Sequence, residues 1–94
     1  EVVHAAFEWA IREESGHLEY EFSKLKGKYR AIVTTCAKLG TAEPVEIARE
    51  LREQSDNIRP FLPTLIEEGY LAKQNGSYKI RDPVFENYVK LKIA

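Results

Sequence analysis

Several residue types are scarce in this chain. Its 94 residues include one cysteine and no methionine, and no apolar run approaches the roughly 20 residues that a membrane-spanning helix needs. A single cysteine excludes an intrachain disulfide and a multi-cysteine zinc site, which favours a cytoplasmic protein over a secreted scaffold or a membrane protein. Because no methionine begins the chain, we expect it to be a piece of a longer protein.

Residues that commonly carry catalysis are also sparse. His4 and His17 belong to no metal-binding motif, and Cys36 lies on the apolar face of an expected helix, where a small core residue fits. Glu67 and Glu68 are neighbours in sequence, but adjacent helical positions point in different directions. We therefore expect no catalytic, metal-binding or cofactor-binding residue here, and no enzyme activity in this segment alone.

What is present is the composition of one small globular domain, with 44% hydrophobic and 31% charged residues. The net charge of −1 is unevenly distributed, because residues 1–22 sum to −5 and residues 23–94 to +4. Two parts with different surfaces are expected: a helical connector over 1–27, packing on or extending the domain, and a compact domain over 28–94.

The connector is expected to begin with an amphipathic helix from Glu1 to about Ser15, ended by Gly16. Its broad apolar side is a candidate interaction surface, made of Val2, Val3, Ala6, Phe7 and Trp9. Residues 17–26 fit both strand and helix spacing. We favour a helix because no candidate partner strand occurs before residue 70.

The domain is expected to begin with three helices. The first runs from Lys28 to Gly40, with its inner face at Tyr29, Ile32, Val33, Cys36 and Leu39. Thr41 is expected to cap the second, whose inner face is Pro44, Ile47, Ala48 and Leu51. After a short tether over 52–54, Ser55 is expected to cap the third, which ends at Gly69 and turns Ile58, Leu62, Leu65 and Ile66 inward. Pro60 and Pro63 predict a start or bend near Arg59.

After Gly69 the hydrophobic period changes to that of strands. Asn75-Gly76 predicts a two-residue hairpin turn, since both of its central positions need positive φ. Asp82-Pro83 then predicts the cap and first residue of a last helix that carries Val84, Phe85, Tyr88, Val89 and Leu91. The expected fold class is mainly α with a small β-hairpin.

This order, a three-helix core followed by a wing, resembles the winged helix-turn-helix fold, with extra helices at both ends. IVTTCAKLGTAEPVEIARELRE and LPTLIEEGYLAKQNGSYKIRDPVFENYV resemble the C-terminal domain of archaeal AAA+-related P-loop ATPases, whose wing is often followed by an aromatic-X-Ile-X-Asp-Pro stretch. The matching residues are Tyr78, Ile80, Asp82 and Pro83. The resemblance implies a parent protein that binds ATP and magnesium. This segment lacks the phosphate-binding loop, because Gly27-Lys28 is followed by Tyr29.

The resemblance makes duplex DNA the first expected partner, bound mainly through backbone phosphates with weak sequence preference. The outward face of the third helix is expected to present Asp56, Asn57, Arg59, Pro60, Pro63, Thr64 and Glu67, which is nearly neutral. Bases therefore have to come from elsewhere, and the DNA-binding candidates are Asn57, Arg59, Thr64, Lys73, Lys79 and Arg81. Bases at Lys24, Lys26, Lys28 and Arg30 fit ordinary solvated side chains better.

Two other functions stay open. The domain fits a protein-interaction module that docks on the upstream ATPase core or on a partner through its prolines, glutamates and apolar first helix. It also fits a transcription regulator that self-associates through its terminal helices to form a dimer.

Overall fold

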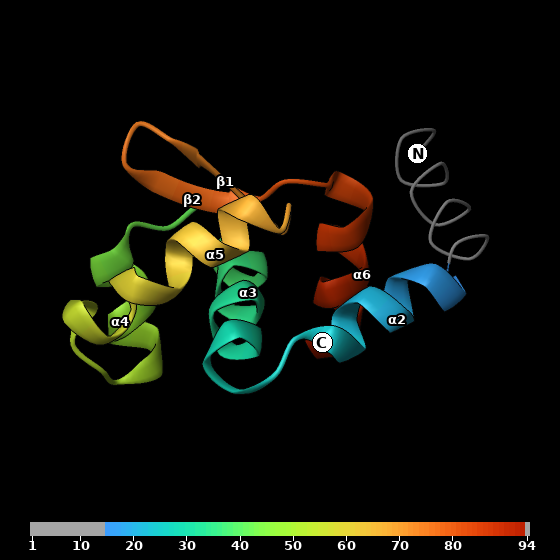
Figure 1. Cartoon of the computed structure of the whole chain (residues 1–94), viewed down its shortest axis with the longest axis horizontal. Coiled ribbons are helices and arrows are strands. Elements are labelled where there is room, and N and C mark those ends of the chain that lie inside the picture. The colour runs from blue at the N-terminus through green and yellow to red at the C-terminus, as the bar shows by residue number, and fades with distance from the viewer. Residues whose placement is uncertain (1–14, 94) are drawn as a thin grey trace.

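The computed structural model describes residues 15–93. The expected first helix and the interaction-surface candidates Val2, Val3, Ala6, Phe7 and Trp9 lie outside the described residues. The described elements, in chain order, are α2 (Ser15–Lys24), α3 (Gly27–Leu39), α4 (Pro44–Leu51), the 3₁₀ turns η1 (Ser55–Asn57) and η2 (Arg59–Phe61), α5 (Leu62–Glu67), β1 (Leu71–Gln74), β2 (Ser77–Ile80) and α6 (Pro83–Ile93). Residues 15–93 are mainly helical with one small antiparallel hairpin, in agreement with the expected fold class (Figure 1).

Helix α2 corrects one boundary and settles one ambiguity. Residues 17–24 are helical, as favoured above, but Gly16, which was expected to end a helix, is the second residue of this one. A glycine ends a helix when it takes positive φ, and Gly16 does not. Leu18, Phe22 and Leu25 are buried, so this part of the expected connector packs against the domain.

Helix α3 lies at the centre of the molecule and contacts α4, β2 and α6 (Figure 1). Ile32, Val33 and Cys36 are fully buried, and the N–H of Gly40 donates to the Cys36 carbonyl at 2.8 Å where the helix ends. Leu39 was expected inside but is 39% exposed, at the last residue of the helix.

The cap of α4 differs from expectation. Glu43, not Thr41, is the N-cap, and it forms a reciprocal capping box with Glu46, whose Oε1 accepts from the Glu43 N–H at 2.8 Å. The preceding residue explains the shift, because Ala42 exchanges two backbone hydrogen bonds with Tyr78 of β2, at 2.9 and 2.8 Å. This isolated bridge adds a third extended segment to the hairpin.

The expected third helix is broken. Two 3₁₀ turns, η1 and η2, precede the six-residue α5, and Gln54 rather than Ser55 is the N-cap of η1. Pro60 and Pro63 lack the N–H that a continuous α-helix would use, which accounts for the break. Ile58, Leu62 and Leu65 are buried as expected.

The hairpin turn and the start of the last helix lie where the sequence predicts them. Asn75 and Gly76 have φ of 53° and 82°, and the register pairs Leu71 with Ile80 and Lys73 with Tyr78. Asp82 caps α6, because its Oδ1 accepts from the Val84 N–H at 2.9 Å. Leu91 is a further correction. The sequence places it on the inner face, but it is 61% exposed near the end of α6.

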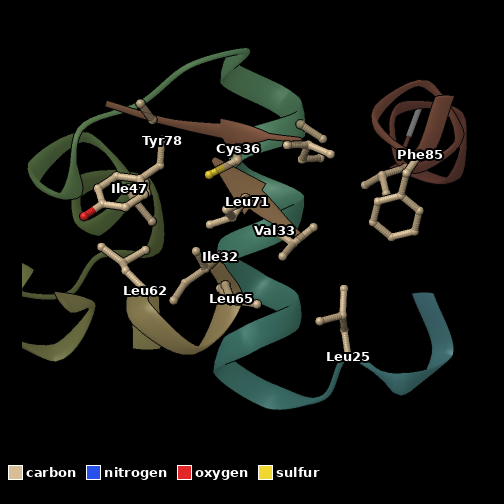
Figure 2. Packing of buried hydrophobic residues seen from close by; sticks show 14 of the residues in the cluster. Leu25, Ile32, Val33, Cys36, Ile47, Leu62, Leu65, Leu71, Tyr78 and Phe85 are labelled. Carbon is tan, nitrogen blue, oxygen red and sulfur yellow. The ribbon is translucent and has the colours of Figure 1, made fainter. Parts of the chain in front are cut away.

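The core surrounds α3. Figure 2 shows Ile47, Leu62 and Tyr78 on one side of this helix and Phe85 of α6 on the other. On the first side, α4, α5 and the hairpin pack around mainly aliphatic side chains. The second side brings together the rings of Phe22, Phe85 and Tyr88, from α2 and α6.

Candidate nucleic-acid interface

The outward face of the η1–η2–α5 segment is exposed, as the sequence predicts. Every residue assigned to that face is exposed in the structure: Asp56, Asn57, Arg59, Pro60, Pro63, Thr64 and Glu67. It carries one base against two acids, so the segment has little attraction of its own for phosphates. Its neighbours therefore determine the electrostatics of this side of the molecule.

One neighbour is the hairpin. A hollow of about 500 Å³ between α5 and the hairpin is lined by Pro63, Ile66, Glu67, Lys73 and Tyr78. The Lys73 Nζ lies 5.7 Å from the centre of the Tyr78 ring, its cross-strand partner. Tyr78 is buried, so its ring is a core side chain and not a platform for stacking bases. Lys73 is the hairpin base nearest the exposed α5 face.

The other hairpin bases point elsewhere. Lys79 pairs with Ala72, so by strand alternation it lies on the opposite face of the hairpin from Lys73. Arg81 follows β2, and its N–H donates to the Tyr70 carbonyl at 3.0 Å, which places it at the base of the hairpin beside Gly69. The three bases thus surround the hairpin and do not share one face.

The opposite flank of α5 holds bases that the sequence did not favour. A hollow of about 340 Å³ there is lined by residues that include Lys24, Lys26, Tyr29, Thr64, Glu68 and Tyr70. It joins Thr64 of α5 to the corner between α2 and α3. Sequence reasoning missed this arrangement, since the two lysines lie about forty positions from Thr64 and only the tertiary fold brings them together.

The structure divides the expected run of four bases into two pairs. Lys28 forms an ion pair with Glu53, and the guanidinium of Arg30 lies 4.1 Å from the centre of the Phe22 ring. Both therefore have partners away from the hollow beside α5, whereas Lys24 and Lys26 line that hollow, and Lys24 pairs with Glu21 at 3.4 Å. Asn57 lies in η1, exposed but outside both hollows.

Three further features of the described residues concern metal binding, cysteine reactivity and membrane crossing. Within residues 15–93, no three His, Cys, Asp or Glu side chains are grouped to hold a metal ion. Burial, with a smaller contribution from the charge of Glu86, raises the pKa of the Cys36 thiol to about 12, so this cysteine stays protonated and unreactive. No helix of the same range has the length and apolar character that a bilayer crossing requires.

Comparison of the chain with protein-family models, with characterised proteins and with solved structures finds no match. The arrangement of side chains around α5 is therefore the main guide to function.

Proposed function

We propose that residues 28–94 form a winged helix-turn-helix domain that binds duplex DNA, mainly through backbone phosphates and with weak sequence preference. The element order supports this fold: α3, α4 and the broken third helix precede the hairpin. The bridge between Ala42 and Tyr78 supports it further, because it ties the segment before α4 to the wing. The hairpin is the wing in this proposal, and α5 is the helix that faces the groove.

One observation carries the DNA assignment. Residues 71–81 contain three bases, Lys73, Lys79 and Arg81, and no acid, and this basic hairpin stands beside an exposed helix. Phosphate neutralisation supplies most of the affinity of sequence-independent DNA binding, and bases on a projecting hairpin can reach the backbone from either of its faces.

Weak sequence preference follows from the side chains of the α5 face. Direct readout uses arginine, lysine and amide side chains that hydrogen-bond to base edges. Arg59 and Asn57 are the two side chains of these types on this face, while Pro60 and Pro63 have no polar side-chain atom. We therefore expect phosphate contacts to position the domain and little discrimination between base pairs.

We also propose that the parent protein is a P-loop ATPase that holds ATP and magnesium in a part outside this segment. The Tyr78, Ile80, Asp82 and Pro83 motif supports this assignment. Gly27 and Lys28 begin α3, and the Lys28 ammonium pairs with Glu53, which argues against a nucleotide site in this segment.

Titration of a labelled duplex of about two helical turns, followed by fluorescence anisotropy at low and moderate salt, tests the DNA assignment. We expect binding at low salt that weakens steeply as salt rises. Lys73→Gln with Lys79→Gln should weaken it, whereas Lys38→Gln with Lys90→Gln removes the same charge from α3 and α6 and serves as the matched control. Absence of binding at tens of micromolar protein in low salt would reject DNA binding.

A second candidate function is docking on the upstream ATPase core or on a partner protein. The exposure of Tyr20 on α2 and Leu91 on α6, each 61%, favours it, since both are large apolar side chains. Mixing the domain with the separately expressed upstream part should then give a complex in sedimentation velocity, and Leu91→Ala should weaken it. The same experiment on the domain alone tests self-association as a dimeric regulator, which a monomer would exclude.

A further inference from the structure

We propose that the corner between α2 and α3 is a second phosphate-binding flank, in which Lys24 and Lys26 contact the DNA strand opposite to the one that Lys73 contacts. This inference rests on the DNA binding proposed above. It assigns a role to residues of the connector and not of the winged helix itself. The position of α5 between two hollows, each bordered by lysine, is the basis for it.

The geometry suits a duplex. A helix that faces the major groove has a phosphate backbone on each side, because the groove is about 12 Å wide and a helix with its side chains is of similar width. The hairpin supplies Lys73 on one side of α5, and without Lys24 and Lys26 the other side would present mainly Thr64 and Glu68. With Lys24 and Lys26, α5 has basic side chains on both of its sides.

The corner is held in place by buried contacts. Leu25 lies between the two lysines and is 4% exposed, so it anchors the corner while its neighbours project into solvent. The Tyr70 hydroxyl contacts the backbone carbonyl of Glu21 at 3.1 Å and the Oε1 of the same residue at 3.2 Å, donating its one proton to one of the two. These contacts fix the end of α2 to the junction between α5 and β1.

Two carboxylates oppose the lysines. Glu21 pairs with Lys24 at 3.4 Å, and Glu68 lines the hollow itself. The Lys24 side chain is about half exposed in that pair, so its ammonium group can exchange the carboxylate for a phosphate at little cost. Lys26 has no ion pair among residues 15–93 and is exposed, as a contact with a DNA phosphate requires.

The salt dependence of binding tests the proposal. Each lysine that contacts a phosphate contributes about 1 to the slope of log affinity against log salt. Lys24→Gln with Lys26→Gln should lower the slope by about 2 and weaken binding at moderate salt by tenfold or more, whereas Lys38→Gln with Lys90→Gln should leave the slope unchanged. Circular dichroism of both variants checks that a loss of binding does not come from unfolding.

A gain of affinity provides a test that unfolding cannot imitate. Glu68→Gln removes the carboxylate that lines the hollow, so DNA should bind more tightly, by about threefold or more. If the unaltered domain binds no DNA, both the proposed function and this inference are rejected. If it binds but the Lys24 and Lys26 variant matches the control, or Glu68→Gln changes nothing, the second flank alone is rejected.

Discussion

The two sides of α3 are built from different side chains. Towards α4, α5 and the hairpin, residues such as Ile47, Ile58 and Leu65 are at most 1% exposed and make a closed, mainly aliphatic core that also holds the Tyr78 ring. Towards α2 and α6, the rings of Phe22, Phe85 and Tyr88 meet edge to face or stacked, with centres 6.1–6.4 Å apart, and each residue keeps 6–7% of its surface exposed. The aliphatic side holds the proposed DNA-binding domain together, and the aromatic side attaches the connector to it.

Two tyrosine hydroxyls on the aromatic side differ in their hydrogen bonding. The Tyr88 hydroxyl is buried and finds no hydrogen-bond partner among the described residues. Nearby, the Tyr70 hydroxyl has partners on Glu21. Burying a hydroxyl without a partner is unfavourable, so the aromatic side is stabilised less than its apolar area suggests. We infer that the aliphatic side determines global stability and that the aromatic side is the weaker attachment.

The largest expected effect comes from a cavity on the aliphatic side. Leu65→Ala should lower the free energy of unfolding by about 2–5 kcal/mol, because the 1%-exposed side chain leaves a void that its neighbours fill incompletely. Urea denaturation followed by circular dichroism measures the change. Leu91→Ala is the matched control on an exposed leucine and should stay within about 0.5 kcal/mol. Equal losses in the two variants would contradict the assignment of the core.

Alkaline pH tests the same side through Cys36. Its pKa rises from 9.0 to about 12 on folding, so the folded state holds the thiol proton more tightly than the unfolded state does. The resulting stability is fully present below pH 9 and is lost as the pH rises towards about 12. Burial and the charge of Glu21 raise the pKa of Tyr70 from 10.0 to about 12, which adds a loss above pH 10.

The measurement is the melting temperature from about pH 8 to about pH 11. It should decline for the unaltered protein and decline less for Cys36→Ala, which has no proton to lose. If the two proteins show the same slope above pH 9, Cys36 is not the group responsible.

The sequence predicted the elements whose signals are local. Asn75-Gly76 and Asp82-Pro83 determine a turn and a cap through their own backbone preferences, and both appear where expected. The buried face of α3 follows from spacing alone, except at Leu39. Where neighbouring residues in sequence decide the conformation, prediction succeeds.

Features that depend on distant residues escaped prediction. Thr41 was expected to cap α4, but the pairing of Ala42 with Tyr78 gives that role to Glu43. Likewise, nothing in the spacing of the bases near residue 26 shows that Lys28 meets Glu53 while Lys26 lines the hollow beside α5. The candidate interface was therefore predictable in its helix face and hairpin, but not in its second flank.

A smaller effect should show that the aromatic side of α3 can loosen while the aliphatic side stays folded. Phe22→Leu removes the edge contacts to Phe85 and Tyr88, each worth about 0.5–1.5 kcal/mol, and should loosen α2 without unfolding the rest. Hydrogen exchange should then accelerate in α2 while the amides of α3 keep their protection. Tyr20→Leu alters an exposed ring on the same helix and should leave exchange unchanged. Uniform acceleration in α2 and α3 would show that the two sides unfold as one unit.

The smallest expected effect comes from removing the hydroxyl group of each of two tyrosines, one without and one with a hydrogen-bond partner. Tyr88→Phe removes a buried hydroxyl without a partner among residues 15–93, so stability should stay constant or rise by up to about 1 kcal/mol. Tyr70→Phe deletes an identical hydroxyl that contacts Glu21, and should cost about 1 kcal/mol. Urea denaturation of the two variants side by side decides the matter. A loss on Tyr88→Phe as large as that on Tyr70→Phe would mean that the Tyr88 hydroxyl does have a partner in solution, and that the aromatic side is better satisfied than its geometry indicates.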